Sequence, residues 1–456
     1  MQNKIKDCHI LKLISGRERE VSFHTPGHKA DFCYGRLFPA ADMDVTELSY
    51  TDDLSSPSGV IAKAQADIAE IVGAKRSYIL TDGSTSGVFA MMYAVRRKGK
   101  KIIVPRNCHK SVWNACALLG LEPVIVQGEE CGGVMQPPSP EQIGRLICGD
   151  QSIAGLVVTS PDYYGNIAPL QEYSKVLRGN GRYLLIDGAH GGHLAYEEGR
   201  KGYAGLYADI WIDGAHKSMP ALTQGSLVHL NDLSLQSSLE EGLNIFRTSS
   251  PSFPVMASVE YSVKYCDFAR ESTEKLKKAV CATRERIEEI GYNVYPSADW
   301  TKLAVDFAFA GKDASLANEY LEKNGIYAEF NDGRYILFYL SANTKISELK
   351  RLEEVLAEIY GADGLNADCF TRAEFSYGEN SSYGYLNAVN AEYEYVDLQN
   401  AAGRIAAANA GISPPCIPVA AAGEIITPQV IELLIKAPHA FGVEGGKIKV
   451  VRKYEG

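Results

Sequence analysis

Short apolar runs alternate with helix-like segments between residues 59 and 230. The segment GVIAKAQADIAEIVGA (59–74) has the apolar spacing of an amphipathic helix that ends at a glycine. SGVFAMMYAVRRKG (86–99) predicts a second helix with basic residues near its C-terminal end. The strands that the pattern predicts are RSYIL, KIIVP, EPVIVQ, IAGLVVTS, GRYLLID and ADIWID. This alternation predicts an α/β fold with a mostly parallel sheet and helices on both faces.

The pattern changes after Met256. A charged amphipathic stretch at 260–291 predicts a long helix or a helix pair, and YAEFNDGRYILFYL (327–340) alternates about Asp332 and Gly333 as a β-hairpin does. A chain of 456 residues is too long for a single hydrophobic core. We predict four segments, which are an N-terminal segment at 1–50, a large domain at 51–255, a small α/β domain at 256–360 and a C-terminal domain at 361–456.

The composition and net charge of the chain indicate which kind of ligand the protein binds. The chain is 46% hydrophobic and 22% charged, as an ordinary globular protein is, and its formal net charge of -10 argues against a nucleic-acid or anionic-membrane surface. A small-molecule substrate is therefore expected. We expect neither a signal peptide nor a membrane anchor in the first residues, and the 10 cysteines include no CxxC pair. We expect a cytoplasmic protein with reduced thiols and no structural metal site.

Ligands of open α/β sheets bind beyond the carboxyl ends of the strands. The segments found there are TDGSTSG (81–87), RNCHKS (106–111), SPDYYGN (160–166), DGAHGGH (187–193) and DGAHKS (213–218). None of them is a glycine-rich dinucleotide fingerprint or a Walker-type loop. In TDGSTSG, Ser84 and Thr85 would stand with free backbone N–H groups at a helix N-terminus, which favours binding of a phosphate. A simple helix cap is the alternative for either residue.

Two further strand ends carry complementary chemistry. Asp187 follows the apolar run RYLLI, where a buried carboxylate needs a cationic partner such as a protonated ring nitrogen. Lys217 follows the strand ADIWID, where desolvation would leave a neutral amine able to form a Schiff base. The alternatives are an aspartate that caps the next helix and a lysine at the surface. A phosphate cradle, an acid and a lysine, in this order, together predict a pyridoxal phosphate site.

The sequence resembles the ornithine/lysine/arginine decarboxylase family of fold-type-I pyridoxal phosphate enzymes, in the short bacterial form without an N-terminal wing domain. The motifs that carry the resemblance are HTPGHK (24–29), GVIAKAQ (59–65), TDGSTSG, NCHKS (107–111), SPDYYGN, HKSMPALTQ (216–224), TSSPSFPVMAS (248–258), GIYAEFNDGRYILFYLS (325–341) and GRIAAANAGISPPCIPVAAAGE (403–424). They extend over nearly the whole chain. The resemblance implies a cytoplasmic homodimer with shared active sites, or a higher homo-oligomer, that uses pyridoxal 5′-phosphate.

The resemblance also implies roles for individual residues. Lys217 would bind the cofactor aldehyde, Asp187 would pair with the pyridinium nitrogen, and Ser84 and Thr85 would bind the phosphate. His109 would stack on one face of the ring and Ala189 would pack against the other face. His216 would lie near the phosphate or take part in proton transfer, in competition with Lys217.

Two loops have open interpretations. FRTSSPSFPV (246–255) predicts an exposed loop, which the resemblance extends across a dimer interface toward the partner's phosphate through Thr248, Ser249 or Ser250; a plain linker is the alternative. HTPGHK predicts a glycine turn that lines the active site, because two histidines without a third ligand make a poor zinc site. A zinc enzyme built on His190, His193 and His216 is disfavoured for the same reason.

The substrate is the least determined feature. Arginine, lysine and ornithine each need an acidic partner for a distal cation, and the candidates are Glu424, Glu329, Asp332 and Asp162. The short form favours arginine, with agmatine and polyamine synthesis. Gly214, Gly188 and Cys416 depart from the family's usual serine, acidic residue and glycine. Another fold-type-I enzyme, such as an aminotransferase or lyase, and a binding protein without catalysis are the alternative functions.

Overall fold

The computed structural model describes residues 8–15, 25–26, 28–29, 38–367, 376–413, 416–437 and 439–452. The chain forms two compact units, each assembled from segments that are distant in the sequence. Unit 1 comprises Met1–Val95, Leu184–Lys277 and Ser341–Thr344, and unit 2 comprises Arg96–Tyr183, Lys278–Leu340 and Lys345–Gly456. The predicted division into four consecutive segments stays a prediction.

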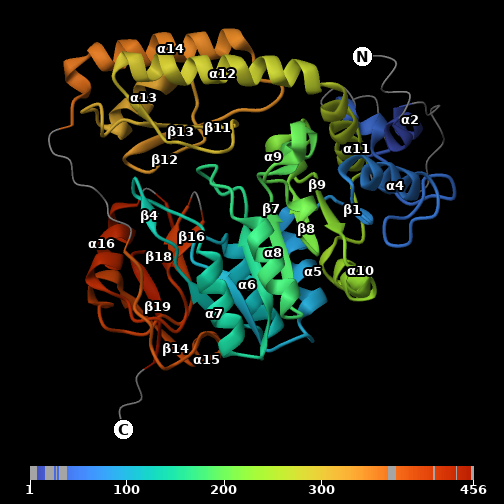
Figure 1. Ribbon diagram of the computed structural model, residues 1–456, viewed down its shortest axis with the longest axis horizontal. Coiled ribbons are helices and arrows are strands. Elements are labelled where there is room, and N and C mark those ends of the chain that lie inside the picture. Colours follow the sequence, from blue (N-terminus) through green and yellow to red (C-terminus); the bar gives the residue numbers. More distant parts are fainter. Residues whose placement is uncertain are drawn as a thin grey trace. The chain divides into compact units, whose positions relative to one another are not determined.

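Unit 1 contains four strands of a mixed sheet in the order β1-β9-β8-β7 (Figure 1). Their bounds are β1 Arg76–Leu80, β9 Ser226–Leu230, β8 Ile210–Asp213 and β7 Tyr183–Gly188. Strand β9 is antiparallel to both of its neighbours, whereas β7 and β8 are parallel. Every residue of β8 and β9 is buried, including the polar residues Asp213, Ser226 and His229.

Helices cover these strands. The main helices of unit 1 are α2 His9–Ser15, α4 Val60–Val72, α5 Ser84–Val95, α9 Ala215–Ser218, α10 Gln236–Phe246 and α11 Phe253–Phe268. Helix α4 ends at Gly73, whose φ of 80° is the left-handed conformation that glycine adopts readily. Helices α5 and α10 pack together, and α5 also packs on β8 and β9. The predicted charged stretch is a helix pair, α11 and α12 Arg270–Ile290.

Gly87 lets α5 lie close to the sheet. A Cβ atom at this position would stand 2.7 Å from Leu80 Cδ1 and 2.9 Å from Ile212 Cδ1. A larger residue would therefore push the helix outward. Gly87 therefore sets how close α5, whose first residue is Ser84, lies to the sheet.

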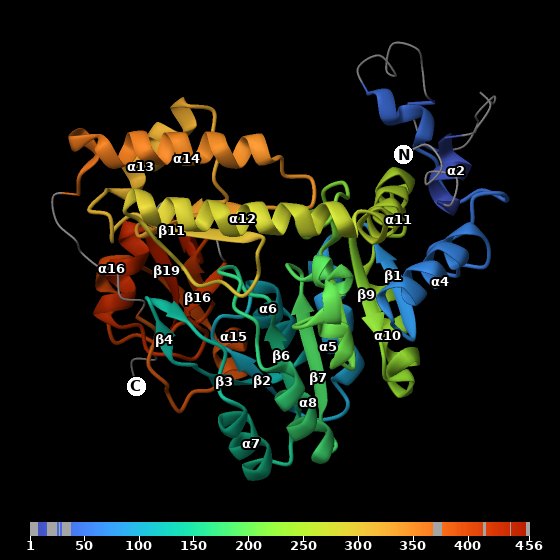
Figure 2. The same ribbon diagram turned by 45° about the horizontal axis from the view of Figure 1, so that its top comes forward.

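Unit 2 contains a parallel set of strands in the order β6-β2-β3, followed along the chain by a second sheet in the order β10-β11-β13-β12. The strands are β2 Lys101–Pro105, β3 Glu122–Val126, β6 Ile153–Thr159, β10 Asn293–Val294, β11 Lys302–Asp306, β12 Phe330–Asn331 and β13 Tyr335–Tyr339. The predicted hairpin is confirmed, with Phe330 opposite Leu337. The helices are α6 Lys110–Leu119, α7 Pro140–Gly149, α8 Leu170–Gly179, α13 Ala314–Lys323 and α14 Ile346–Gly361, and Figure 2 shows α13 beside α14.

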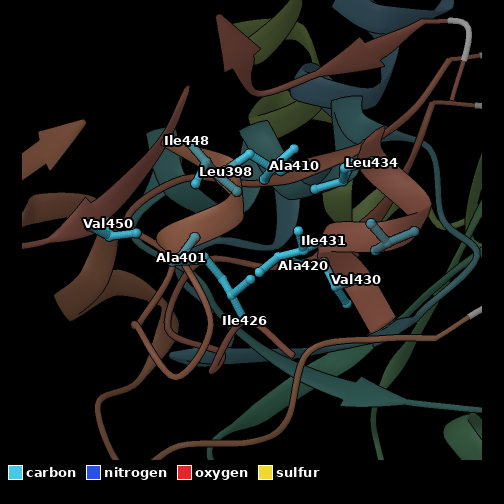
Figure 3. Close-up of a cluster of buried hydrophobic side chains, with 12 residues drawn as sticks. Leu398, Ala401, Ala410, Ala420, Ile426, Val430, Ile431, Leu434, Ile448 and Val450 are labelled. Carbon is cyan, nitrogen blue, oxygen red and sulfur yellow. The ribbon is translucent and has the colours of Figure 1, made fainter. Parts of the chain in front are cut away.

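The C-terminal part of unit 2 has a core of its own. Its elements are α15 Tyr385–Asn390, β14 Tyr393–Asp397, β15 Ala410–Ile412, β16 Ile417–Ala420, α16 Pro428–Lys436, β17 Ala440–Phe441, β18 Val443–Glu444 and β19 Lys447–Val451. Figure 3 shows Val430 and Ile431 of α16 directed toward Ala420 and Ile426, with Ile448 in the same buried cluster. The predicted α/β class, with a mostly parallel sheet and a C-terminal domain, is confirmed. Among the described residues, no helix is both long enough and apolar enough to cross a membrane.

Candidate active site

Lys217 lies on α9, the single helical turn that follows strand β8. Its side chain is partly buried, and its Nζ stands 3.1 Å from Nε2 of His190. His190 is only 4% exposed. The ammonium group at this strand end is therefore directed at a buried imidazole in the protein interior.

The neighbouring strand β7 supplies the acid. Asp187 is 3% exposed and accepts a hydrogen bond from the N–H of Ala189 at 3.2 Å. A tight turn follows, in which Gly191 N–H donates to Gly188 O at 2.7 Å. Because β7 and β8 are parallel and Asp187 pairs with Ile212, Asp187 and Lys217 leave the same edge of the sheet.

Position 214 has glycine in place of the serine that is usual in the family the sequence resembles, and the packing around Gly214 explains this difference. A Cβ atom at Gly214 would lie 2.3 Å from the carbonyl oxygen of Ala189, a distance that a side chain cannot occupy. The close approach brings the lysine-bearing turn against the backbone that follows Asp187. A serine at position 214 does not fit this backbone.

We expect Gly214→Ser to lower both stability and cofactor occupancy, because the added atoms would push the two turns apart. Overpacking of this kind costs about 1–3 kcal/mol. Thermal unfolding and the absorbance of bound cofactor measure the two effects. Gly179→Ser, where an added Cβ would meet nothing within 4 Å, is the matched control. An unchanged melting temperature in Gly214→Ser would contradict the packing account.

The N-terminus of α5 has the features of an anion site. Gly83 has a φ of 81°, and its N–H donates to Gln224 O at 2.9 Å. Ser84 Oγ lies 2.9 Å from Ser226 Oγ, which also donates to Asp213 O at 2.9 Å. The predicted phosphate residue Thr85 is exposed at the start of the helix. Hydroxyl groups here stand in the positive field of the helix dipole.

His216 is held by the loop that precedes β9. Its Nδ1 lies 2.9 Å from Gly225 O, and its backbone N–H donates to the same oxygen at 3.0 Å. Burial lowers the pKa of the His216 imidazole, and the nearby Lys217 charge acts in the same direction. The lowered pKa favours the neutral form of the His216 ring, although the hydrogen bond to Gly225 O acts in the opposite direction.

His109 belongs to unit 2, where it is the N-cap of α6. Its Nδ1 accepts a hydrogen bond from Ser111 N–H at 3.2 Å, so in the neutral ring the proton resides on Nε2. The cap also sets the direction of the ring. Its predicted role of stacking on the cofactor stays a prediction.

The predicted loop before α11 is exposed at Thr248, Ser249 and Ser250. Thr248 N–H donates to Asp82 Oδ2 at 3.0 Å, which ties the loop to the TDGSTSG segment. In HTPGHK, His24 and Gly27 lie outside the described residues. His28 pairs with Asp44 at 3.3 Å.

Three of the four acidic candidates for a distal cation are already bound within unit 2. Glu424 and Arg106 are each 3% exposed and form a two-point ion pair, and Ala421 N–H donates to Glu424 Oε2 at 2.8 Å. Asp332 accepts from Tyr164 OH and from the N–H groups of the turn that follows it. These carboxylates hold the fold of unit 2 together.

Asp162 is likewise engaged, with Asn166 and a neighbouring N–H as donors. Burial raises its pKa to about 6. Glu329 differs from the other three because its side chain is exposed. Tyr163 OH donates a hydrogen bond to Glu329 Oε1 at the long distance of 3.4 Å.

The family model for the major domain of Orn/Lys/Arg decarboxylases matches residues 12–305, and the model for their C-terminal domain matches residues 365–440. The chain belongs to the Orn/Lys/Arg decarboxylase family. A relative from Bacillus subtilis (strain 168), "Uncharacterized protein YaaO", is 32% identical over 96% of this chain and 95% of its own length. The arginine decarboxylase of the same strain is 28% identical over 94% of each chain.

Solved structures agree on the fold. The lysine decarboxylase LdcF of Francisella novicida has a TM-score of 0.84 at 18% identity, covering 98% of this chain and 81% of its own. The constitutive lysine decarboxylase of Escherichia coli has a TM-score of 0.80 at 18% identity, covering 99% and 82%. With its family, this protein is a pyridoxal-phosphate-dependent decarboxylase of basic amino acids. The residues of unit 1 fit that cofactor, since a buried acid and a lysine share one sheet edge.

Two further residues contact the predicted site residues of this Orn/Lys/Arg decarboxylase, His190 at Lys217 and Ser226 at Ser84. His190 was weighed only as a zinc ligand, and Ser226 was not singled out. The repeated DGAH at 187–190 and 213–216 stands at the ends of two adjacent parallel strands. For Ser226 the only signal was its place at the start of the strand after the lysine loop.

Proposed function

We propose that this decarboxylase acts on L-arginine in preference to lysine or ornithine and forms agmatine for polyamine synthesis. The observation that carries the proposal is full-length similarity to several proteins named arginine decarboxylase, one of them matched over 94% of both chains. By sequence, the Escherichia coli relatives named lysine decarboxylase are matched over 54% of this chain and 38% of their own length. We also propose that the enzyme works in the cytoplasm.

Residues of unit 1 would hold the cofactor, which supplies an electron sink for the carbanion left when carbon dioxide departs. Lys217 would bind its aldehyde carbon, and Asp187 would keep its ring nitrogen protonated. Ser84 and Thr85 would bind its phosphate at the N-terminus of α5, where the Ser84 hydroxyl lies beside Ser226. These roles rest on the shared sheet edge and on the hydrogen bonds around Ser84.

The ring faces would be occupied by Ala189 and by His109. Ala189 is 4% exposed and lies in the turn that follows Asp187. Its methyl group would make apolar contact with one face of the ring. His109, with its ring direction set by the α6 cap, would limit tilting of the cofactor, so that the Cα–carboxylate bond stays perpendicular to the ring. His216 would lie near the phosphate as a neutral hydrogen-bonding ring.

Glu329 is our candidate for the carboxylate that binds the distal cation of the substrate. Glu424, Asp332 and Asp162 have their oxygens engaged inside unit 2, whereas the Glu329 carboxylate is exposed beside Tyr163. A planar guanidinium has several N–H donors and would use both Glu329 oxygens, which favours arginine.

Glu329→Gln is expected to raise the KM for the preferred amino acid roughly 10- to 100-fold, since a hydrogen bond to a charged group contributes about 1.5–3 kcal/mol. Bound cofactor should be unaffected. Steady-state kinetics with arginine, lysine and ornithine measure the change. Glu354→Gln, at an exposed site on α14, is the control. An unchanged KM would remove Glu329 from the distal-cation site.

The substrate itself is tested by incubating the purified protein and pyridoxal phosphate with arginine, lysine and ornithine in parallel. Amine and carbon dioxide are then followed together. We expect agmatine and an equal amount of carbon dioxide from arginine at the highest kcat/KM. Higher kcat/KM with lysine or ornithine would overturn the arginine assignment and leave the decarboxylase assignment intact.

We further propose a homodimer, or a higher homo-oligomer, with shared active sites. Ser249 would reach the partner's cofactor phosphate from the exposed loop that Thr248 ties to Asp82. The N-terminal segment, with His28, would line the same shared site. Sedimentation equilibrium of the holoenzyme tests this proposal, and a monomer at assay concentration would overturn it.

A further inference from the structure

Two histidines flank Lys217, one in the sequence and one in space. His216 precedes the lysine directly, but its ring is bound to the loop at Gly225. His190 comes from the preceding strand end, and its Nε2 lies 3.1 Å from Lys217 Nζ. The two rings therefore have different access to the proton of the lysine.

The hydrogen bond of His216 limits what this ring can donate. A carbonyl oxygen only accepts hydrogen bonds, so the contact with Gly225 O places a proton on His216 Nδ1. A neutral imidazole carries one N–H, and here that proton is already used. At neutral pH, His216 has no second proton to give.

The contact of His190 is of the opposite kind. Lys217 Nζ and His190 Nε2 are 3.1 Å apart, which is hydrogen-bonding distance. The proton of this hydrogen bond can be bonded to either nitrogen. The imidazole is 4% exposed and stands on the tight turn closed by Gly191 N–H and Gly188 O, so its position is fixed by backbone. A proton can thus pass between the two groups without bulk water.

We propose that His190 is the base that takes a proton from Lys217 Nζ and later returns it. This inference rests on the proposed role of Lys217 as the lysine that binds the cofactor. In the forward step an N–H bond of the ammonium breaks, an Nε2–H bond forms on His190, and the positive charge moves to the imidazole. The lysine keeps its electron pair as a neutral amine.

The neutral amine is the form that attacks an aldehyde, and an adjacent base is a general means of producing it. With cofactor and substrate bound, the same exchange would let the Lys217 amine give a proton to the substrate's Cα or take one from it. His190 then acts through Lys217, as a positioning and proton-exchanging residue.

The test follows how the rate of cofactor capture depends on pH. Full-length protein freed of cofactor is mixed with pyridoxal phosphate, and the growth of visible absorbance is recorded from acidic to alkaline pH. In His190→Gln the ring is replaced by an amide that cannot titrate. We expect the midpoint of the rate profile to move upward by about one pH unit or more, because solvent must then deprotonate the lysine.

His193→Gln is the matched control, since it removes another buried histidine from the same segment after β7. Its midpoint should stay at the wild-type value. In His190→Ala, added imidazole should restore the capture rate at neutral pH in proportion to its concentration. If His190→Gln does not fold, His190→Asn serves for the same profile.

An unchanged midpoint in a folded His190 variant, together with no imidazole effect, would overturn the inference and reduce His190 to a packing residue. That outcome is distinct from failure of the proposed function. If the wild-type protein captures no pyridoxal phosphate, the role of Lys217 itself falls. If capture is normal and only the shift is absent, only the role of His190 falls.

Discussion

Lys217→Ala is expected to abolish the visible absorbance of bound cofactor and to lower turnover by roughly 10⁴-fold or more, the scale seen when a covalent nucleophile is lost. The reason is chemical, because an alanine methyl group cannot form a bond to an aldehyde carbon. Spectra of the purified variant and assays of carbon dioxide release measure the two effects. The fold should persist, since Lys217 is partly exposed on a single helical turn.

The control for this prediction is Lys201→Ala, at an exposed lysine of the same unit. It should retain both absorbance and turnover. Borohydride treatment of the wild-type holoenzyme should attach the cofactor permanently to the peptide that contains Lys217. Turnover retained in the Lys217 variant would refute the assignment of the lysine.

Glu424→Gln is expected to destabilise unit 2 by about 3–5 kcal/mol, the cost of breaking a buried ion pair by removing one charge. Arg106 and Glu424 are each 3% exposed, and Arg106 also lies over the rings of Trp113 and Tyr377. The variant leaves a guanidinium buried opposite a neutral amide. Urea unfolding followed by circular dichroism measures the loss.

Glu432→Gln is the matched control, because Glu432 is 65% exposed in its pair with Lys436 on α16. Exposed pairs of this kind contribute about 0–1 kcal/mol. The double variant Arg106→Leu with Glu424→Leu should recover part of the stability, since neither charge is then buried alone. Equal losses for Glu424→Gln and Glu432→Gln would contradict the buried-pair account.

This pair also bears on specificity. From the sequence, Glu424, Glu329, Asp332 and Asp162 are equal candidates, because a distal cation needs an acidic partner and their spacing does not rank them. Only the packing separates them: Glu424 neutralises a buried arginine, Asp332 and Asp162 satisfy N–H and O–H groups, and Glu329 faces solvent. An acidic residue next to a strand end is therefore a candidate ligand only if its own fold has not already used its oxygens.

Much of the molecule could be predicted from the order of its residues. The runs at 77–80, 184–187 and 210–213 lie in strands and are fully buried, and a short continuous apolar run is what a strand covered on both faces requires. The Asp332–Gly333 turn was equally visible, since φ is 89° at Gly333 and glycine tolerates that value. Lys217 and Asp187 were found because strand ends in α/β sheets face ligands.

Contacts between residues that are distant in the sequence were decided only by the tertiary structure. The Lys217–His190 contact depends on the pairing of β7 with β8, and the Ser84–Ser226 contact on the pairing of β1 with β9. The need for glycine at 214 follows from a backbone oxygen of residue 189. A sequence pattern shows which side of a helix or strand is buried. It does not show which buried side chains are in contact, and proton transfer between two side chains requires such a contact.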